Sequence, residues 1–141
     1  MKIVKATKED TEKLTRMLKV LDVAGFEFSQ KERVEKHIEA RMFFLASEGT
    51  EDVLGLIGLR INHKSCEIYA IVSEKRGVGK QLIDFAIEKC RNENVPKLWC
   101  WSMSQHNARE FYEKMGFEEQ YLLKRQWNGE DCYFFGKTIK I

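Results

Sequence analysis

Between residues 68 and 87, an apolar strand, a glycine turn and an amphipathic helix follow one another. The strand is residues 68–72, the turn contains Gly77 and Gly79, and the helix carries apolar side chains at positions 82, 83, 86 and 87. This spacing is typical of a helix whose apolar face packs on a sheet. Glycine allows the backbone to turn sharply or to approach another group closely. The segment therefore predicts a chain in which a strand leads through a tight turn into a helix.

The start of this helix is predicted to bind an anion. The first N–H groups of a helix have no partner inside it, and the helix dipole places positive charge there. Arg76 and Lys80 lie beside these groups, so the turn suits a phosphate. Two common phosphate-binding loops are disfavoured. Gln81 stands where a Walker loop needs Ser or Thr, and no third glycine completes a dinucleotide fingerprint.

Composition narrows the class of protein further. The 141 residues are 43% hydrophobic and 11% aromatic, enough for a packed core, and we expect one domain over residues 1–141. The net charge is +2 with acids and bases interleaved, which disfavours nucleic acid as a partner. No apolar run reaches the roughly 20 residues of a membrane span, and the amino terminus lacks a signal-peptide core. We therefore expect a cytoplasmic protein that is not embedded in a membrane.

The four cysteines, Cys66, Cys90, Cys100 and Cys132, are widely spaced. No CxxC pair is present, and no histidine is placed to complete a zinc site. Their surroundings are mostly apolar, which favours small buried side chains. We expect no metal, and a thiol-redox or metal protein is disfavoured.

Hydrophobic periodicity and turn residues predict the element order β-α-α-β-β-β-α-β-α-β-β. The predicted strands are residues 2–5, 43–46, 53–61, 66–72, 97–102, 119–127 and 131–139, and the predicted helices are residues 7–21, 29–41, the segment from the glycine turn to about 91, and 107–115. This order indicates an α/β (α+β) fold with a mixed, largely antiparallel sheet.

Particular residues are expected to set the ends and irregularities of these elements. Thr7 or Asp10 is expected to cap the first helix. Ser29 is expected to cap the second helix, with Glu32 closing a capping box. Hairpin turns are expected at residues 49–52 and 128–129. Gly55 and Gly58, inside a strand, indicate a bulge or a close neighbour.

Two stretches resemble the GNAT-superfamily N-acetyltransferases. Residues 76–82 (RGVGKQL) are similar to the family's acyl-CoA loop, of the form Arg/Gln-x-x-Gly-x-Gly/Ala. Residues 107–117 (NAREFYEKMGF) are similar to its later helix, which ends in Tyr-Glu-Lys-Leu-Gly-Phe. The resemblance covers essentially the whole chain and implies a GNAT-like acyl-CoA N-acyltransferase fold. It also implies that acetyl-CoA is the cosubstrate and that the acetyl group goes to a primary amine of a small molecule or protein, by direct attack in a ternary complex.

The resemblance also assigns residues to coenzyme A. It implies that the pyrophosphate lies on the backbone amides of the glycine turn and that the pantetheine arm lies along the end of the preceding strand. The implied cofactor-binding residues are Ile71, Val72, Ser73, Arg76, Gly77, Val78, Gly79, Lys80, Gln81 and Asn107. The family usually has Arg or Gln three residues before the first motif glycine, and this chain has Glu74. Because an acid facing a diphosphate is unfavourable, we assign the basic role to Arg76.

The resemblance places Tyr112 in the role of general acid. A phenol with a pKa of about 10 suits protonation of a thiolate; the alternative is a tyrosine that only packs on the sheet. Glu67 lies on the strand where some members carry a general base. The alternatives for the base are His63, His106 or a relay through water, with Glu67 then a rim carboxylate or ion-pair partner. Asn107 either hydrogen-bonds pantetheine or caps the helix that follows it.

The first two helices and their loop are expected to select the acceptor. The loop includes Phe26, Glu27 and Phe28, which suit a cationic amine and equally suit helix packing. Trp99 and Trp101 share a face of one strand; one is expected in the core and the other in the acceptor cleft. Edge strands near the carboxyl terminus are compatible with a homodimer. The alternative function is a non-catalytic acyl-CoA-binding or regulatory module of the same fold.

Overall fold

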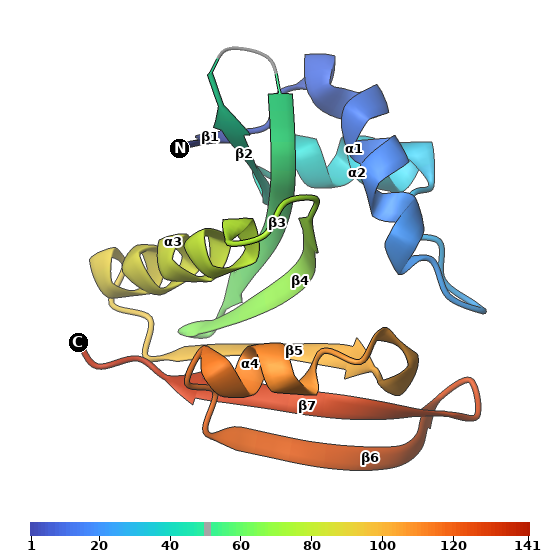
Figure 1. Ribbon diagram of the computed structural model, residues 1–141, viewed down its shortest axis with the longest axis vertical. Coiled ribbons are helices and arrows are strands. Elements are labelled where there is room, and N and C mark those ends of the chain that lie inside the picture. The colour runs from blue at the N-terminus through green and yellow to red at the C-terminus, as the bar shows by residue number, and fades with distance from the viewer. Residues whose placement is uncertain (50–51) are drawn as a thin grey trace. The chain divides into compact units, whose positions relative to one another are not determined.

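The structure is a computed structural model that describes residues 1–49 and 52–141. Figure 1 labels its helices and strands, and short 3₁₀ helices are denoted η. In chain order the elements are β1 (Lys2–Lys5), η1 (Lys8–Asp10), α1 (Thr11–Leu18), η2 (Lys19–Leu21), α2 (Lys31–Glu39), β2 (Phe43–Glu48), β3 (Asp52–Asn62), β4 (Ser65–Ser73), α3 (Val78–Asn92), β5 (Lys97–Met103), η3 (Ser104–His106), α4 (Arg109–Lys114), β6 (Glu119–Trp127) and β7 (Glu130–Thr138). The order of strands and α-helices predicted from the sequence is confirmed.

The strands form a seven-stranded sheet in the order β1-β2-β3-β4-β5-β7-β6. The pairs β1–β2, β2–β3, β5–β7 and β6–β7 are antiparallel. β4 and β5 are parallel, with Cys66 opposite Leu98 and Glu67 opposite Trp99. The predicted α+β fold with a mixed, mostly antiparallel sheet is therefore confirmed.

The chain divides into two compact units. The first is Met1–Leu59 with Ala70–Leu82, and the second is Arg60–Tyr69 with Ile83–Ile141. The organisation of residues 1–141 as a single domain stays a prediction.

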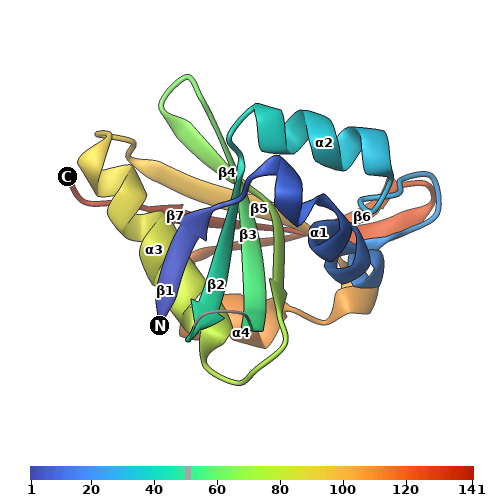
Figure 2. The same cartoon turned by 90° about the horizontal axis from the view of Figure 1, so that it is seen from above.

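The core of the first unit lies where two helices meet the strands. Leu14, Met17 and Leu18 are buried on one face of α1, as the apolar spacing predicts. Figure 2 shows α1 and α2 on the same side of β2 and β3. Residues 43–46 of β2 are buried as a continuous run, which is typical of a strand covered on both faces.

The helix caps agree with the sequence only in part. Thr7 is the N-cap of η1 and Asp10 that of α1. The prediction that Ser29 caps the second helix is wrong. Gln30 is the N-cap, and its side-chain oxygen accepts a hydrogen bond from the N–H of Arg33 at 2.9 Å. Ser29 instead donates from its N–H and its hydroxyl to the carboxylate of Asp22, a contact between distant residues that competes with capping.

β3 is irregular at Gly55. Ala46 pairs with Gly55, but the next residue, Ser47, pairs with Val53, so Leu54 is an extra residue in the strand. The prediction of a bulge at this position is confirmed. The predicted turn over residues 49–52 includes residues 50 and 51, which lie outside the described residues.

Gly55→Ala is expected to lower the free energy of unfolding by about 2 kcal/mol. The added Cβ would lie 2.7 Å from Cγ1 of Val78 and 2.8 Å from the carbonyl oxygen of Val72. A backbone oxygen cannot move aside as a side chain can, so the strand itself must shift. Urea unfolding at equilibrium measures the change. Gly129→Ala is the control, because its φ is +79° and no atom lies within 4 Å of the added Cβ. A smaller loss for Gly55→Ala than for this control would contradict the steric argument.

The second unit contains the antiparallel strands β5, β7 and β6, with β7 between the other two. The turn between β6 and β7 has Asn128 and Gly129 at φ 48° and 79°, as a two-residue hairpin requires. Tyr112 of α4 and Phe117 contact each other, and Tyr112 stacks on Phe135 of β7. Figure 1 shows α4 lying along β5 and β7. One face of this part of the sheet is therefore covered by α4.

All four cysteines are buried and free of disulfides, as their apolar surroundings predict. No group of three or more His, Cys, Asp or Glu side chains that could hold a metal is found among the described residues. None of the helices in the described part of the chain is long and apolar enough to cross a membrane.

Candidate functional site

The glycine turn joins β4 to α3 in the first unit. β4 ends at Ser73, and the N–H of Glu74 donates to the carbonyl of Leu54, the bulged residue of β3, at 2.8 Å. The hydroxyl of Ser73 donates to the carbonyl of Lys75 at 2.9 Å. The bulge in β3 thus holds the beginning of the turn, a role that the sequence alone did not reveal.

Gly77 occupies the conformation that only glycine adopts easily. Its φ is +91°, and no atom lies within 4 Å of a Cβ built on it. α3 begins at the next residue, Val78. The N–H groups of Gly77 and Gly79 make no hydrogen bond with any residue that the structure describes. The predicted turn and helix start are therefore in place, with helix N-terminal amides that suit an anion.

The charges around the turn favour Arg76 as its contact with an anion. Lys75 forms an ion pair with Glu48 of β2 at 2.9 Å, and the hydrogen bond from Lys75 lowers the pKa of Glu48. Arg76 is exposed and forms no ion pair with the described residues. Glu74 is exposed beside it, held by its backbone to β3. The arrangement suits the basic role that the sequence assigned to Arg76.

Tyr112 lies on α4 in the second unit and is 3% exposed. Its ring stacks on Phe135 with 4.7 Å between centroids and meets Phe117 edge-on at 5.0 Å. The thiol of Cys100 on β5 lies beside its hydroxyl. Burial raises the pKa of Tyr112 well above its usual value. The phenol therefore stays protonated at neutral pH, the form that a general acid needs.

Glu67 of β4 receives two hydrogen bonds from one guanidinium. Arg60, near the end of β3, donates from Nε at 3.1 Å and from Nη2 at 2.9 Å, both to Oε1 of Glu67. The same guanidinium lies 5.1 Å from the ring centroid of Tyr69. Within the described residues, Oε2 of Glu67 accepts no hydrogen bond. That oxygen is able to accept a proton or an N–H, and the sequence did not identify Arg60 as its neighbour.

Asn107 precedes α4 without capping it. Its φ is 51°, it is the C-cap of η3, and the N-cap of α4 is Ala108. The alternative in which Asn107 caps the helix is therefore excluded. His106 lies in η3, where burial lowers its pKa, and His63 lies in the turn between β3 and β4 at φ 50°.

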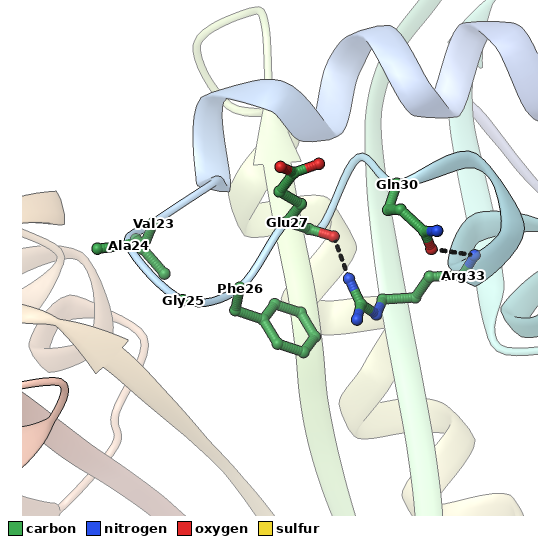
Figure 3. Close-up of a pocket in the computed structure, with 7 residues that line it drawn as sticks. All are labelled: Val23, Ala24, Gly25, Phe26, Glu27, Gln30 and Arg33. Atoms are coloured by element: carbon green, nitrogen blue, oxygen red, sulfur yellow. Dashed lines mark hydrogen bonds between the residues drawn. The ribbon is translucent and has the colours of Figure 1, made fainter.

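A pocket of about 600 Å³ lies in the loop between α1 and α2. Figure 3 shows its lining residues: Val23, Ala24, Gly25, Phe26, Glu27, Gln30 and Arg33. The guanidinium of Arg33 lies 4.1 Å from the ring centroid of Phe26 and donates to the carbonyl oxygen of Glu27. The carboxylate of Glu27 points away from this guanidinium (Figure 3) and is exposed. Phe26 and Glu27, two of the three residues expected here, line the pocket, whereas Arg33 and Gln30 were not expected.

A family model described as the acetyltransferase (GNAT) family matches residues 11–117. The chain belongs to this family. GNAT proteins are acetyl-CoA-dependent N-acetyltransferases, so the enzyme class and the cosubstrate expected from the sequence are confirmed at the level of the family.

Solved structures of GNAT acetyltransferases share the fold of the whole chain. Ard1 from Thermoplasma volcanium has a TM-score of 0.83 and 18% identity, covering 99% of this chain and 98% of its own. The ribosomal-protein-S18-alanine N-acetyltransferase from Escherichia coli has a TM-score of 0.80 and 16% identity, covering 99% and 94%. An aminoglycoside 6'-N-acetyltransferase complexed with coenzyme A has a TM-score of 0.81 and 17% identity, covering 100% and 98%. No curated protein matches this GNAT chain significantly in sequence.

Proposed function

We propose that this GNAT protein transfers the acetyl group of acetyl-CoA to a primary amine of a small molecule or protein, by direct attack in a ternary complex. The observation that carries the proposal is the turn at Gly77, with α3 starting at Val78 and Arg76 exposed beside it. Helix N-terminal amides and a neighbouring cation are the groups that bind a diphosphate. The pyrophosphate of coenzyme A is proposed to bind here.

The cofactor-binding residues are proposed to act mainly through their backbones. Ile71, Val72 and Ser73 would present the edge of β4 to the pantetheine arm. The amides of residues 76–81, with the side chains of Arg76 and Lys80, would hold the diphosphate. Asn107, exposed and in a left-handed conformation, is proposed to hydrogen-bond the pantetheine.

In the transfer step, the amine nitrogen attacks the thioester carbon, an N–C bond forms and the C–S bond breaks. Positioning the two reactants supplies much of the acceleration. Glu67 is proposed to take the proton that the nitrogen loses, through Oε2, while Arg60 holds Oε1. Tyr112 is proposed to protonate the departing thiolate.

The acceptor is proposed to be selected in part by the loop of α1 and α2. The exposed carboxylate of Glu27 and the ring of Phe26 would meet a cationic amine. An acceptor screen over polyamines, amino acids, aminoglycosides and peptide N-termini, following the release of coenzyme A thiol, tests the proposed reaction. Binding of acetyl-CoA without turnover on any of these amines would favour the non-catalytic module instead.

Acetyl-CoA is expected to raise the Tm of the protein. A ligand at a hundred times its Kd adds about 2.7 kcal/mol to the free energy of unfolding. Gly77→Ala is expected to remove most of this shift, because an alanine at φ +91° strains the turn that holds the diphosphate. Thermal unfolding with and without millimolar acetyl-CoA measures both effects.

Gly129→Ala is the matched control for Gly77→Ala. It introduces the same left-handed strain with the same open space around the Cβ, at a hairpin outside the proposed site. Both variants are expected to lose about 1 kcal/mol of stability, and only Gly77→Ala is expected to lose the response to acetyl-CoA. An unchanged response in Gly77→Ala would remove the glycine turn from the proposed site.

A further inference from the structure

Four aromatic side chains form an exposed platform on the second unit. Trp101 of β5, Phe134 of β7 and Tyr121 of β6 are directly opposite one another across the three strands, so they share a face. Trp99 lies two residues before Trp101 and shares that face. Trp101 is 46% exposed and Tyr121 is 55% exposed. These four side chains are called the aromatic platform.

The rings of the platform hold one another in place. Trp99 stacks on Phe134 with 5.8 Å between centroids, and Tyr121 stacks on it at 6.3 Å. Trp101 meets Phe134 edge-on at 5.2 Å. α4 covers the opposite face of this sheet, where Phe135 is fully buried. The platform is thus an ordered aromatic surface open to solvent.

A cation of the chain already lies on an aromatic ring of this face. The ammonium of Lys97, on the same face of β5, is 5.9 Å from the ring centroid of Phe134. Lys97 is also paired with Glu119, and the two side chains meet over Gly136, where an added Cβ would lie 2.6 Å from Oε1 of Glu119 and 3.1 Å from Nζ of Lys97. In the part of the chain that the structure describes, no cation lies over Trp101. Tryptophan is the aromatic residue that attracts cations most strongly.

The platform lies close to the proposed base. Trp99 is the register partner of Glu67 across β4 and β5, and Trp101 is two residues further along β5. The spacing of strands and the rise per residue put the Cα atoms of Glu67 and Trp101 about 8 Å apart. This is within the reach of one extended aliphatic amine. The nitrogen that attacks the thioester must be deprotonated, whereas a ring binds the protonated form.

We propose that the aromatic platform, centred on Trp101, binds a second, non-reacting cationic nitrogen of the acceptor. The acceptor is then an aliphatic diamine or polyamine rather than a simple monoamine. The role of the platform in selecting the acceptor rests on the proposed acetyl transfer. The binding of a cation to the platform does not depend on turnover. The experiment therefore has a binding arm and a kinetic arm.

The binding arm uses the three tryptophans of the chain as reporters. The indole N–H signals of ¹⁵N-labelled protein are followed by NMR during titration with tetramethylammonium chloride, with tert-butanol as a neutral probe and sodium chloride as a salt control. The signal of Trp101 is expected to shift and saturate with tetramethylammonium only. Trp127 is 41% exposed and lies outside the platform, so the chemical shift of its indole N–H is expected to remain unchanged. Equal responses to tert-butanol, or shifts that follow protein concentration through self-association, would overturn the proposal.

The kinetic arm compares 1,5-diaminopentane with 1-aminopentane as acceptors. The parent protein is expected to show a KM about fivefold lower for the diamine, and Trp101→Ala is expected to abolish that preference with little change in kcat. Trp127→Ala is the matched control and is expected to retain it. A second pair is Tyr121→Ala and Leu122→Ala, neighbours of similar exposure on opposite faces of β6; only the first is expected to weaken the preference.

The two arms separate the two proposals. A parent without preference for the diamine, or a Trp101→Ala variant that keeps it, would overturn the role of the platform while acetyl transfer stands. If no amine is acetylated but tetramethylammonium still shifts Trp101, the acetyl-transfer proposal fails and the cation site remains. If tetramethylammonium leaves Trp101 unchanged, the cation site is rejected whatever the turnover.

Discussion

Tyr112→Phe is expected to lower kcat by about 100-fold, the contribution of a positioned general acid, with any amine that the parent acetylates. The variant keeps the ring that stacks on Phe135 and meets Phe117, so the fold and the Tm shift with acetyl-CoA are expected to persist. Because burial raises the pKa of Tyr112, the parent is expected to keep its activity up to about pH 10 without loss from ionisation of this phenol. Release of coenzyme A thiol at saturating acetyl-CoA measures kcat.

Tyr133→Phe is the matched control for this experiment. Tyr133 is on β7 and stacks on Phe135 at 5.5 Å, so the variant removes a phenol from the same aromatic cluster. Its turnover is expected to match that of the parent. A Tyr112→Phe variant with the same kcat as Tyr133→Phe at every pH would leave Tyr112 with a packing role only.

The free energy of unfolding is expected to fall steeply as the pH rises above about 8.5, the usual pKa of a thiol. Burial raises the pKa of Cys100 to about 12. Below pH 8.5 the thiol of Cys100 is protonated in both the folded and the unfolded chain, and its contribution to the free energy of unfolding is fully present. Between these values the unfolded chain releases a proton that the folded chain keeps, so stability falls by about 1.4 kcal/mol per pH unit for this group. The loss is complete at about pH 12.

The comparison of Cys100→Ala with the parent isolates this thiol from the other titrating groups. At pH 8 the variant is expected to be less stable, because it leaves a cavity at a buried position. Urea unfolding between pH 8 and 11 measures the difference in the free energy of unfolding between the variant and the parent. This difference, the stability gap, is expected to shrink as the pH rises. Leu98→Ala, at a fully buried position of the same strand face, is the control, and its gap is expected to stay constant. A constant gap for Cys100→Ala would contradict the raised pKa.

Local patterns were sufficient for the order of elements. The apolar spacing of α1 and α3, the alternation in β4 and the Asn128–Gly129 turn each reflect interactions within a few residues. Capping was less predictable where the side chain had a distant partner. Serine is a residue type that commonly caps helices, but Ser29 is hydrogen-bonded to the carboxylate of Asp22. Gln30 is the N-cap instead.

The same distinction between local and long-range interactions applies to the candidate site. Through their motifs and positions, the sequence predicted Gly77, Arg76, Glu67 and Tyr112 as site residues. It did not identify the groups that act on them from other elements. Leu54 holds the start of the turn, Arg60 holds Glu67, and Cys100 lies beside Tyr112. These contacts join residues whose separation in sequence carries no periodic signal.

By itself, the sequence determined the kind of fold, the membership of the GNAT family through two motifs in order, and the glycine turn at the start of a helix. Those features depend on backbone conformation and spacing within short segments, which residue types encode directly. Only the tertiary structure decided what surrounds each functional side chain: the burial that raises the pKa of Tyr112, the guanidinium on Glu67 and the alignment of Trp101, Phe134 and Tyr121 into one surface. Burial, ion pairing and cross-strand register are set by strands and helices that are far apart in the chain, and they exist only after those elements have packed.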